Sequence, residues 1–517
     1  MIYLVEFDAV DAAGNLVTER LATDGYTTRS SDTPSSVYFA ERIINPGNFE
    51  RSMFGAGRTS GEAEVGYGVI ECAIGDDGSG ETLDRLAGHA VDGRSLRIYG
   101  LDSVRSPWAQ RVLVFDGTME QIEINWTVAT IRIRDRLAEL RKEIQSSTYA
   151  GTTVAGGMNE AEGAADDLKD RPKPLLFGIA RNIPAVLANR FDRIYQVSSK
   201  PLSAILGVYD RGVPLTAGAD HATIEALRTA TIPGGQYHTA LALGLLRVAG
   251  APDGDLTVDA VEGAVGDRSA AGIVRRMLDA AGVAYASQDI EALHALAPAE
   301  VGLWLPPETR DLLASITSVL DSIGAYMVPD AQGLMRFGRL DAAPVGGIII
   351  DRTIILDAGE GIERLATNDD GRGVPAWKVS VSYARSWLVQ NGTALDNTAI
   401  TDARKAFVGQ EYRQAVSESE AVKDRHLLAS ELAFTTLIDS EADAVAEAAR
   451  RMALYGVRRE RYRVPLKTEI AVQLGVDIGD AVTLRLDRFG LSDGKPMVVI
   501  AVENELETGI TTLDLWG

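Results

Sequence analysis

The pattern at the C-terminal end constrains the fold of this 517-residue chain more than any other feature. Three runs rich in Val, Ile, Leu and Thr lie at 481–486, 495–502 and 510–516, and turns containing Gly and Asp separate them. A two-residue period interrupted by such turns is typical of antiparallel strands. We therefore predict that the chain closes with a three-stranded β meander.

Length and composition indicate a globular protein of several domains. The chain exceeds a single ordinary core, which predicts about three or four domains. Its hydrophobic content of 46% and charged content of 24% are ordinary for a soluble protein. The net charge of −22 argues against a sequence-specific nucleic-acid reader and against docking on anionic lipid. Two interpretations of this charge stay open: simple solubility, or a channel wall that repels passing DNA.

The single cysteine, Cys72, excludes an intrachain disulfide and any metal or iron–sulfur site built from several thiolates. It lies in an alternating segment at 69–74, where we expect a small buried apolar residue. The first residues lack the basic region of a signal peptide, and no apolar run is long enough to span a bilayer. We expect synthesis in the cytoplasm and no stable membrane insertion.

The hydrophobic pattern predicts a mainly β, multidomain fold with α+β insertions. Strict alternation, as at 121–126, separates a wet face from a buried one, and short turns favour antiparallel β-barrel-like domains. The expected blocks are a first barrel-like domain at 1–145, a Gly-rich acidic linker at 146–172, a β-leaning domain at 173–266 that could pair with the C-terminal meander, a helical domain with a hairpin at 267–346, a second barrel-like domain at 347–440, and a helix followed by the meander at 441–517.

Helical periodicity appears in four places. Apolar positions spaced by three and four predict helices at 134–144, 273–281 and 308–323, the last of which Pro307 should open. A near capping box that begins at Ser440 predicts a further helix ending before Gly456.

The histidines offer no recognisable catalytic or metal motif. No two of them share the spacing of metal ligands, and none begins an H-E-x-x-H pattern, in the set His89, His221, His238, His294 and His426. We interpret them as structural or surface residues. The sequence therefore predicts no catalytic residue, no cofactor-binding residue, no metal site and no enzymatic activity.

Two other features only superficially resemble functional motifs. The loop at 55–61 has the spacing G-x-G-x-x-x-G, one residue off a dinucleotide fingerprint, and a strand rather than a helix follows it. We interpret it as a flexible loop or a tight barrel corner. The acidic pairs Asp76-Asp77, Asp166-Asp167 and Asp369-Asp370 are expected to be solvated loop tips, although the loop at 76–80 could hold calcium weakly.

The densest basic cluster comprises Arg458, Arg459, Arg461 and Arg463. Nucleic-acid binding would favour interleaved aromatic residues, and only Tyr462 serves that purpose. We expect these arginines to pack against acidic groups of the same chain or to contact another subunit.

Three segments resemble the baseplate hub, or tail-tip hub, proteins of tailed, siphophage-like bacteriophages. They are the C-terminal meander at 479–516, the ordered phrases within 174–216 that begin Pro-Leu-Leu-Phe-Gly, and the helix at 308–323 with the hairpin that follows at 326–337. None contains a catalytic motif, so the similarity lies in the order of these segments.

This resemblance implies a homotrimer in the virion, at the baseplate or tail tip, with a role in DNA ejection. Two related β-barrel-like domains in each subunit, for which 1–145 and 347–440 are the candidates, would form a pseudo-sixfold ring. The ring would dock on the tail tube or distal tail protein, and the tape-measure protein would end in its bore. Because the chain ends at Gly517, fibre or spike proteins are expected to be separate. Acids such as Glu120, Glu123 and those within 158–170 are expected to include lumen-facing positions.

Two alternatives remain at this point. A tail-associated cell-wall hydrolase would need a deep cleft with converging carboxylates or a histidine-centred zinc site. A carbohydrate-binding attachment protein would need exposed aromatic residues, with Trp108, Trp304 and Trp387 as candidates. We expect each of these tryptophans to pack in a core or an interface instead.

Overall fold

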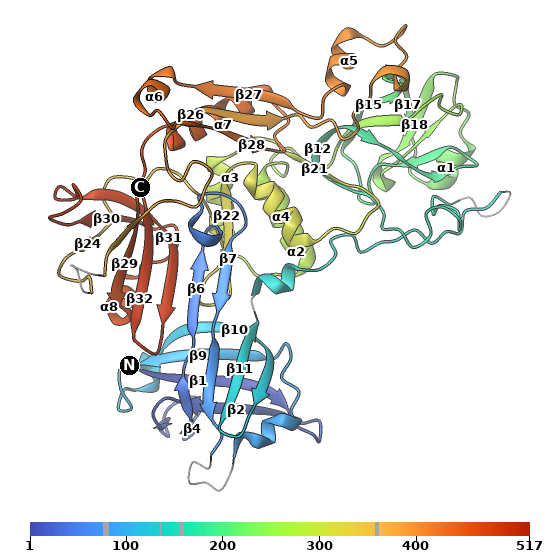
Figure 1. Cartoon of the computed structure of the whole chain (residues 1–517). Coiled ribbons are helices and arrows are strands. Elements are labelled where there is room, and N and C mark those ends of the chain that lie inside the picture. Colours follow the sequence, from blue (N-terminus) through green and yellow to red (C-terminus); the bar gives the residue numbers. More distant parts are fainter. Residues whose placement is uncertain (76–81, 135, 156–159, 357–360) are drawn as a thin grey trace.

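The computed structural model describes residues 1–517 except 76–81, 135, 156–159 and 357–360. The described part is mainly β and multidomain, as the sequence predicts. Its sheets surround a central group of helices (Figure 1). Within the described residues the sheets are open rather than closed barrels. No helix in these residues has both the length and the apolar character needed to cross a bilayer.

The N-terminal sheet has nine strands in the order β3-β4-β2-β1-β9-β10-β11-β8-β5. Alternate side chains on its strands pack into one core, where Cys72 has no exposed surface, as predicted. The strands are β1 (Ile2–Val10), β2 (Leu16–Ala22), β3 (Tyr26–Thr27), β4 (Tyr38–Glu41), β5 (Ile43–Asn45), β8 (Val69–Ala73), β9 (Ser95–Leu101), β10 (Val112–Ile124) and β11 (Val128–Arg134). Short 3-10 turns η2 (Leu83–Gly88) and η3 (Trp108–Gln110) connect them.

The predicted C-terminal meander is confirmed and forms the centre of a second large sheet. Its order is β24-β30-β31-β32-β29-β25, and every neighbouring pair is antiparallel except β24 with β30. The strands are β24 (Ile348–Asp351), β25 (Glu363–Leu365), β29 (Arg461–Lys467), β30 (Ala481–Arg485), β31 (Lys495–Glu505) and β32 (Ile510–Trp516). Helix α8 (Thr468–Leu474) precedes β30 and ends at Gly475, which has a φ of +64°. Glycine tolerates this left-handed conformation without the penalty that other residues incur.

An N-terminal hairpin also belongs to this sheet. Strand β6 (Asn48–Ser52) pairs antiparallel with β31, so that Ser52 lies opposite Ala501 and Asn48 opposite Glu505. Its partner β7 (Glu64–Tyr67) forms the outer strand of the hairpin. The 3-10 turn η1 (Gly55–Gly57) lies in the loop between them. Figure 1 shows this hairpin rising from the N-terminal sheet alongside β31.

Residues 173–305 build two five-stranded sheets. One has the order β16-β15-β20-β12-β21 and the other β13-β14-β19-β18-β17. Their elements are β12 (Leu175–Pro184), β13 (Val186–Asn189), β14 (Ile194–Gln196), β15 (Ala204–Asp210), β16 (Val213–Pro214), β17 (Thr216–Asp220), α1 (Ile224–Thr229), β18 (Gln236–Ala240), η5 (Leu241–Leu243), β19 (Leu245–Val248), β20 (Leu256–Val261) and β21 (Gly302–Leu305). In the described residues these strands pair among themselves, and none joins the C-terminal meander. Tyr149, within 146–172, is fully buried in the same core as Ile194 and Leu227.

The central helices are α2 (Ala270–Ala281), α3 (Ser287–Leu296) and α4 (Leu312–Asp321), and the hairpin β22 (Ala325–Pro329) and β23 (Met335–Arg339) follows as predicted. Helix α2 covers the predicted range. Helix α4 begins later than predicted, because the side chain of Asp311 rather than Pro307 caps it by accepting a hydrogen bond from the Ala314 amide.

The prediction of a helix at 134–144 is wrong, because the described residues of this range contain only the 3-10 turn η4 (Arg136–Leu140). The backbone beyond η4 hydrogen-bonds elsewhere. The Ile144 amide donates to the Arg310 carbonyl over 3.0 Å, and the Leu312 amide donates to the Lys142 carbonyl over 2.9 Å. This segment is thereby extended beside the start of α4 instead of continuing as a helix.

A three-stranded sheet and a long helix complete the fold. The sheet contains β26 (Ala376–Tyr383), β27 (Arg413–Glu418) and β28 (Ser430–Thr435), and α7 (Glu441–Tyr455) packs on β26 and β27. As predicted, Ser440 caps α7 and the helix ends at Gly456. The connections contain η6 (Gly392–Ala394), α5 (Asp402–Val408) and α6 (Glu420–Arg425).

Candidate functional site

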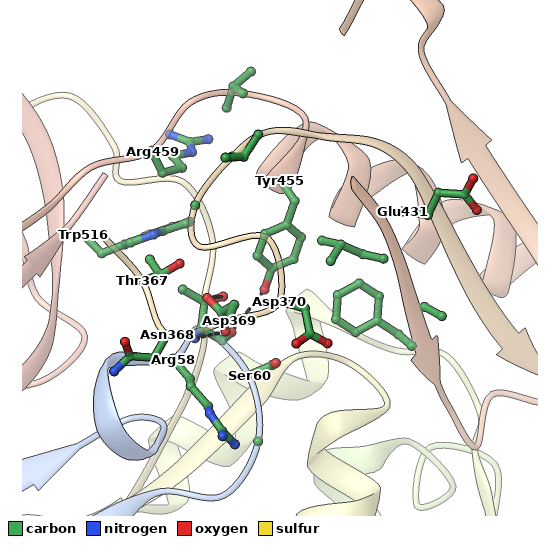
Figure 2. A pocket seen from close by; sticks show the side chains of 18 residues that line it. Arg58, Ser60, Thr367, Asn368, Asp369, Asp370, Glu431, Tyr455, Arg459 and Trp516 are labelled. Carbon is green, nitrogen blue, oxygen red and sulfur yellow. Dashed lines mark hydrogen bonds between the residues drawn. The ribbon is translucent and has the colours of Figure 1, made fainter. Parts of the chain in front are cut away.

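A cleft of about 630 Å³ lies where distant parts of the chain meet. The loop of the β6–β7 hairpin, the loop at 366–374, strand β28, the end of α7 and the end of β32 all contribute to its lining. Figure 2 shows Tyr455 and Trp516 on separate walls, with the side chains of Asp369 and Asp370 below Tyr455 in this view. The cleft therefore depends on the tertiary arrangement rather than on a local motif.

Hydrogen bonds fix the hairpin loop in this cleft. The carboxylate of Asp369 accepts from the Thr59 amide over 2.9 Å and from the Thr59 hydroxyl over 2.8 Å. The Asn368 amide donates to the Gly57 carbonyl over 3.2 Å, and the Tyr455 hydroxyl donates to the Thr59 carbonyl over 3.1 Å. The loop at 55–61 is therefore docked against the rest of the chain. Of the predicted solvated pair, Asp370 is exposed, but Asp369 anchors this contact.

Gly57 is required by the close approach of this loop to the C-terminal sheet. Its φ is +73°, and a Cβ atom there would lie 2.2 Å from the guanidinium carbon of Arg461. That guanidinium is itself fixed, because its Nε donates to both carboxylate oxygens of Asp514 over 2.8 Å. A side chain at position 57 would therefore displace either the loop or a buried ion pair.

Aromatic and cationic groups form the other walls. The rings of Tyr455 and Phe434 stack with centroids 5.7 Å apart, and the guanidinium of Arg459 lies 5.4 Å from the ring centre of Trp516. Burial raises the pKa of Tyr455, so its hydroxyl stays protonated and donates to Thr59. Burial also lowers the pKa of Arg459. These groups hold the walls together, and Asp370 is left as an exposed carboxylate on the lining.

A buried ion network behind the cleft joins α7 to the end of α4. Glu447 accepts hydrogen bonds from Arg450 over 2.7 and 2.8 Å and from Arg451 over 2.6 Å. Arg451 also donates to the Asp321 carbonyl over 2.7 Å, and Arg450 donates to Asp341 over 2.8 Å. Burial opposes ionisation of Glu447, but the two arginines outweigh it and lower the pKa of this carboxyl.

The structure brings two of the predicted histidines together. Nε2 of His221 lies 2.9 Å from Nδ1 of His238, and their rings stack with centroids 5.1 Å apart. Burial, with a smaller contribution from His221, lowers the pKa of His238. Sequence spacing could not reveal this pair, because it depends on the parallel pairing of β17 with β18. Among the described residues, no group of three or more His, Cys, Asp or Glu is placed to hold a metal ion.

The other histidines lie apart from this pair. Nδ1 of His89 lies 2.6 Å from the Arg85 carbonyl, and Nδ1 of His294 lies 2.8 Å from the Ser269 hydroxyl. His426 lines a second pocket, described below.

The arginine cluster divides between two environments. Arg461 pairs with Asp514 and Arg463 pairs with Glu503, both within the chain, so the prediction of packing against acidic groups is confirmed for these two. Arg458 and Arg459 instead line the second pocket.

The remaining acidic pairs are on the surface or outside the described residues. Asp166 forms an ion pair of 3.3 Å with Arg190, and both side chains are largely exposed. The pair Asp76-Asp77 and its proposed calcium loop lie outside the described residues.

The candidate tryptophans pack inside the molecule. Trp108 and Trp304 are each 5% exposed, and Trp387 packs edge-on against Trp304 with centroids 5.9 Å apart. The exposed tryptophan is instead Trp126, which is 97% exposed in the turn between β10 and β11. An alternating pattern that ends in tryptophan does not distinguish a strand position from a turn.

Comparison with known proteins gives matches among solved structures alone. No family model and no curated protein matches the chain. A 43 kDa tail protein of prophage MuSo2 from Shewanella oneidensis is similar at 10% identity and a TM-score of 0.40, covering 99% of this chain and 98% of that one. A chain of a native gene transfer agent virion is similar at 13% identity and a TM-score of 0.43, covering 72% and 91%. A tail protein from Neisseria meningitidis MC58 is similar at 9% identity and a TM-score of 0.36, covering 99% and 96%.

Proposed function

We propose that this protein is a structural, non-enzymatic hub subunit at the baseplate or tail tip of a tailed phage. Three copies form a ring that joins the tail tube or distal tail protein to the fibres or spike. The ring surrounds part of the DNA conduit and meets the tape-measure protein, and residues 1–145 and 347–440 supply its ring-forming domains. The resemblance of the three segments quoted above supports this proposal, and each of them folds as a defined element in the structure.

The observation that carries the proposal is that an edge strand and several large apolar side chains remain exposed and could contact other subunits. Every residue of the edge strand β17 is exposed, so its outer side is available to another chain. Several large apolar side chains also project into solvent: Trp126 at 97% exposure, Val345 at 94%, Leu427 at 92% and Leu428 at 82%. An open strand edge is a ready template for pairing with another chain, and covering exposed apolar side chains on association is favourable.

Mass measurement of the purified chain tests the proposal. Light scattering behind size exclusion should give three times 55.3 kDa, and the same protein should be detected at one tip of intact particles by antibody labelling. A monomer that clears peptidoglycan in a zymogram would refute the proposal and favour a hydrolase. Saturable binding on a glycan array by a monomer would instead favour an attachment protein.

A further inference from the structure

A second pocket of about 440 Å³ concentrates positive charge on this acidic protein. Its lining includes Arg364, Arg372, Arg458 and Arg459, together with His426. These residues come from β25 and the loop after it, from the segment between α7 and β29, and from the residue that follows α6. An accumulation of guanidinium groups around one hollow attracts carboxylates, because each can donate two parallel hydrogen bonds.

The acid in this pocket is already neutralised. Glu460 accepts hydrogen bonds from Arg364, from Lys495 over 3.1 Å and from the Tyr462 hydroxyl over 3.1 Å. By contrast, Arg372 and Arg458 are exposed and make no ion pair within the described residues. The guanidinium groups of Arg372 and Arg458 therefore line the pocket without a carboxylate partner.

Apolar side chains line the same pocket between the arginines, namely those of Leu365, Ala366, Val374 and Pro375. Leu427 and Leu428, which follow the lining residue His426 in the sequence, are 92% and 82% exposed. Arginine beside exposed apolar groups is the composition of a protein-binding surface rather than of a site for a small free anion.

A complementary feature lies at another part of the chain. The turn between β10 and β11 carries Trp126, which is 97% exposed. Glu123, in β10 just before this turn, forms an ion pair of 2.7 Å with Arg132 of the same hairpin. The turn belongs to the N-terminal sheet, whereas Glu460 of the pocket lining exchanges backbone hydrogen bonds with Gly517 at the end of the chain. Tryptophan is the best aromatic partner for a guanidinium, so an exposed tryptophan complements a hollow lined by arginines that have no carboxylate partner.

We propose that the arginine pocket receives the β10–β11 turn of a second copy of this chain, with Trp126 against the pocket's arginines. The contact joins two different surfaces, so repeated use of it closes a ring when the rotation between copies permits. This inference rests on the proposed trimer and identifies one of its contacts. It places Glu123 at a subunit boundary rather than on the lumen wall.

Sedimentation of the full-length chain over a dilution series tests this contact. The double variant Arg372→Glu/Arg458→Glu and the variant Trp126→Ala should each weaken association about tenfold or more, since both remove central groups of one interface. The combined variant should be little worse than either alone, because both changes act on the same contact. Matched controls, Arg352→Glu and Val265→Ala, alter exposed residues elsewhere and should associate like the wild type.

The outcomes separate this inference from the proposed function. A wild-type trimer with unaltered association of both test variants overturns the contact but leaves the trimer intact. Fully additive losses also overturn it, since the two surfaces then belong to different contacts. A monomeric wild type overturns both proposals.

Disulfide crosslinking provides a second test of the contact. Introduced cysteines can be crosslinked specifically, because Cys72 is buried and the surface of the described residues has no other thiol. Chains carrying Trp126→Cys and chains carrying Arg458→Cys should form a mixed disulfide when they are combined and oxidised. Combining Trp126→Cys with Arg352→Cys chains should not. Equal yields from the two mixtures would refute the docking.

Discussion

Replacing Glu447 with alanine should destabilise the junction between α7 and α4. The Glu447 side chain is 8% exposed and is the carboxylate partner of both Arg450 and Arg451. After the substitution Arg450 keeps Asp341 at 2.8 Å. Arg451, 3% exposed, would keep only the Asp321 carbonyl at 2.7 Å and the ring face of Phe434 at 4.1 Å.

The expected loss follows from the one charge that is left buried without a carboxylate. Breaking a buried ion pair by removing one partner costs about 3–5 kcal/mol. Because Arg450 remains paired, we expect a value near the lower limit, about 3 kcal/mol. Hydrogen exchange of the α7 amides is the appropriate assay, since it reports the local free energy of opening in a protein of several domains.

A compensating variant tests the reasoning behind this number. The further change Arg451→Met removes the orphaned charge and keeps an apolar side chain of similar length. The variant Glu447→Ala/Arg451→Met should therefore be more stable than Glu447→Ala alone. Protection of α7 that falls by less than about 1 kcal/mol in the single variant, or that falls further in the double variant, would refute the account of a desolvated charge.

Three further outcomes are expected. Thr59→Val should remove the hydroxyl bond to Asp369, lower the stability of the docked loop by about 1–2 kcal/mol and speed proteolysis there, and an unchanged cleavage rate would contradict the clamp. Burial and His221 lower the pKa of His238 below 6.5, so as the pH falls the unfolded chain takes up a proton before the folded chain does. The stability of the fold should therefore decrease as the pH drops through 6.5. In thermal melts, His238→Gln should make the melting temperature depend less steeply on pH in this range. Burial raises the pKa of the Cys72 thiol to about 12, so a thiol reagent should react only after unfolding, and rapid labelling of the native protein would contradict its burial.

Local patterns in the sequence predict the elements that local interactions determine. The C-terminal meander, α2 and α7 form where periodicity and capping indicate them, because alternation, a capping serine and a terminal glycine act within a few residues. The prediction of a helix at 134–144 is wrong because the hydrogen bonds of this segment are not local. Its amides and carbonyls bond to residues near 311, and no local pattern in 134–144 encodes that partner.

The cleft could not be predicted, because it is made by contacts between segments far apart in the sequence. Its hairpin loop reaches Asp369 and Tyr455, which lie hundreds of positions away from Thr59. The sequence marked the loop as unusual by its glycines but suggested a flexible or corner conformation. The pairing of β6 with β31, which brings the loop into place, involves strands whose own patterns are compatible with many partners.

The contribution of an N-terminal hairpin to the C-terminal sheet has a mechanical consequence for the proposed ring. Strand β6 is hydrogen-bonded along β31, and the loop beyond it is fixed by Thr59 and Asp369, so the N-terminal and C-terminal parts cannot separate without breaking both sets of bonds. A subunit joined in this way presents the β10–β11 turn and the arginine pocket at fixed relative positions. Fixed positions are what a ring requires, because a closed ring forms only when the rotation between its two contact surfaces has one defined value. Weakening the clamp at Thr59 should therefore broaden the distribution of assembly sizes, even though neither contact surface has been altered.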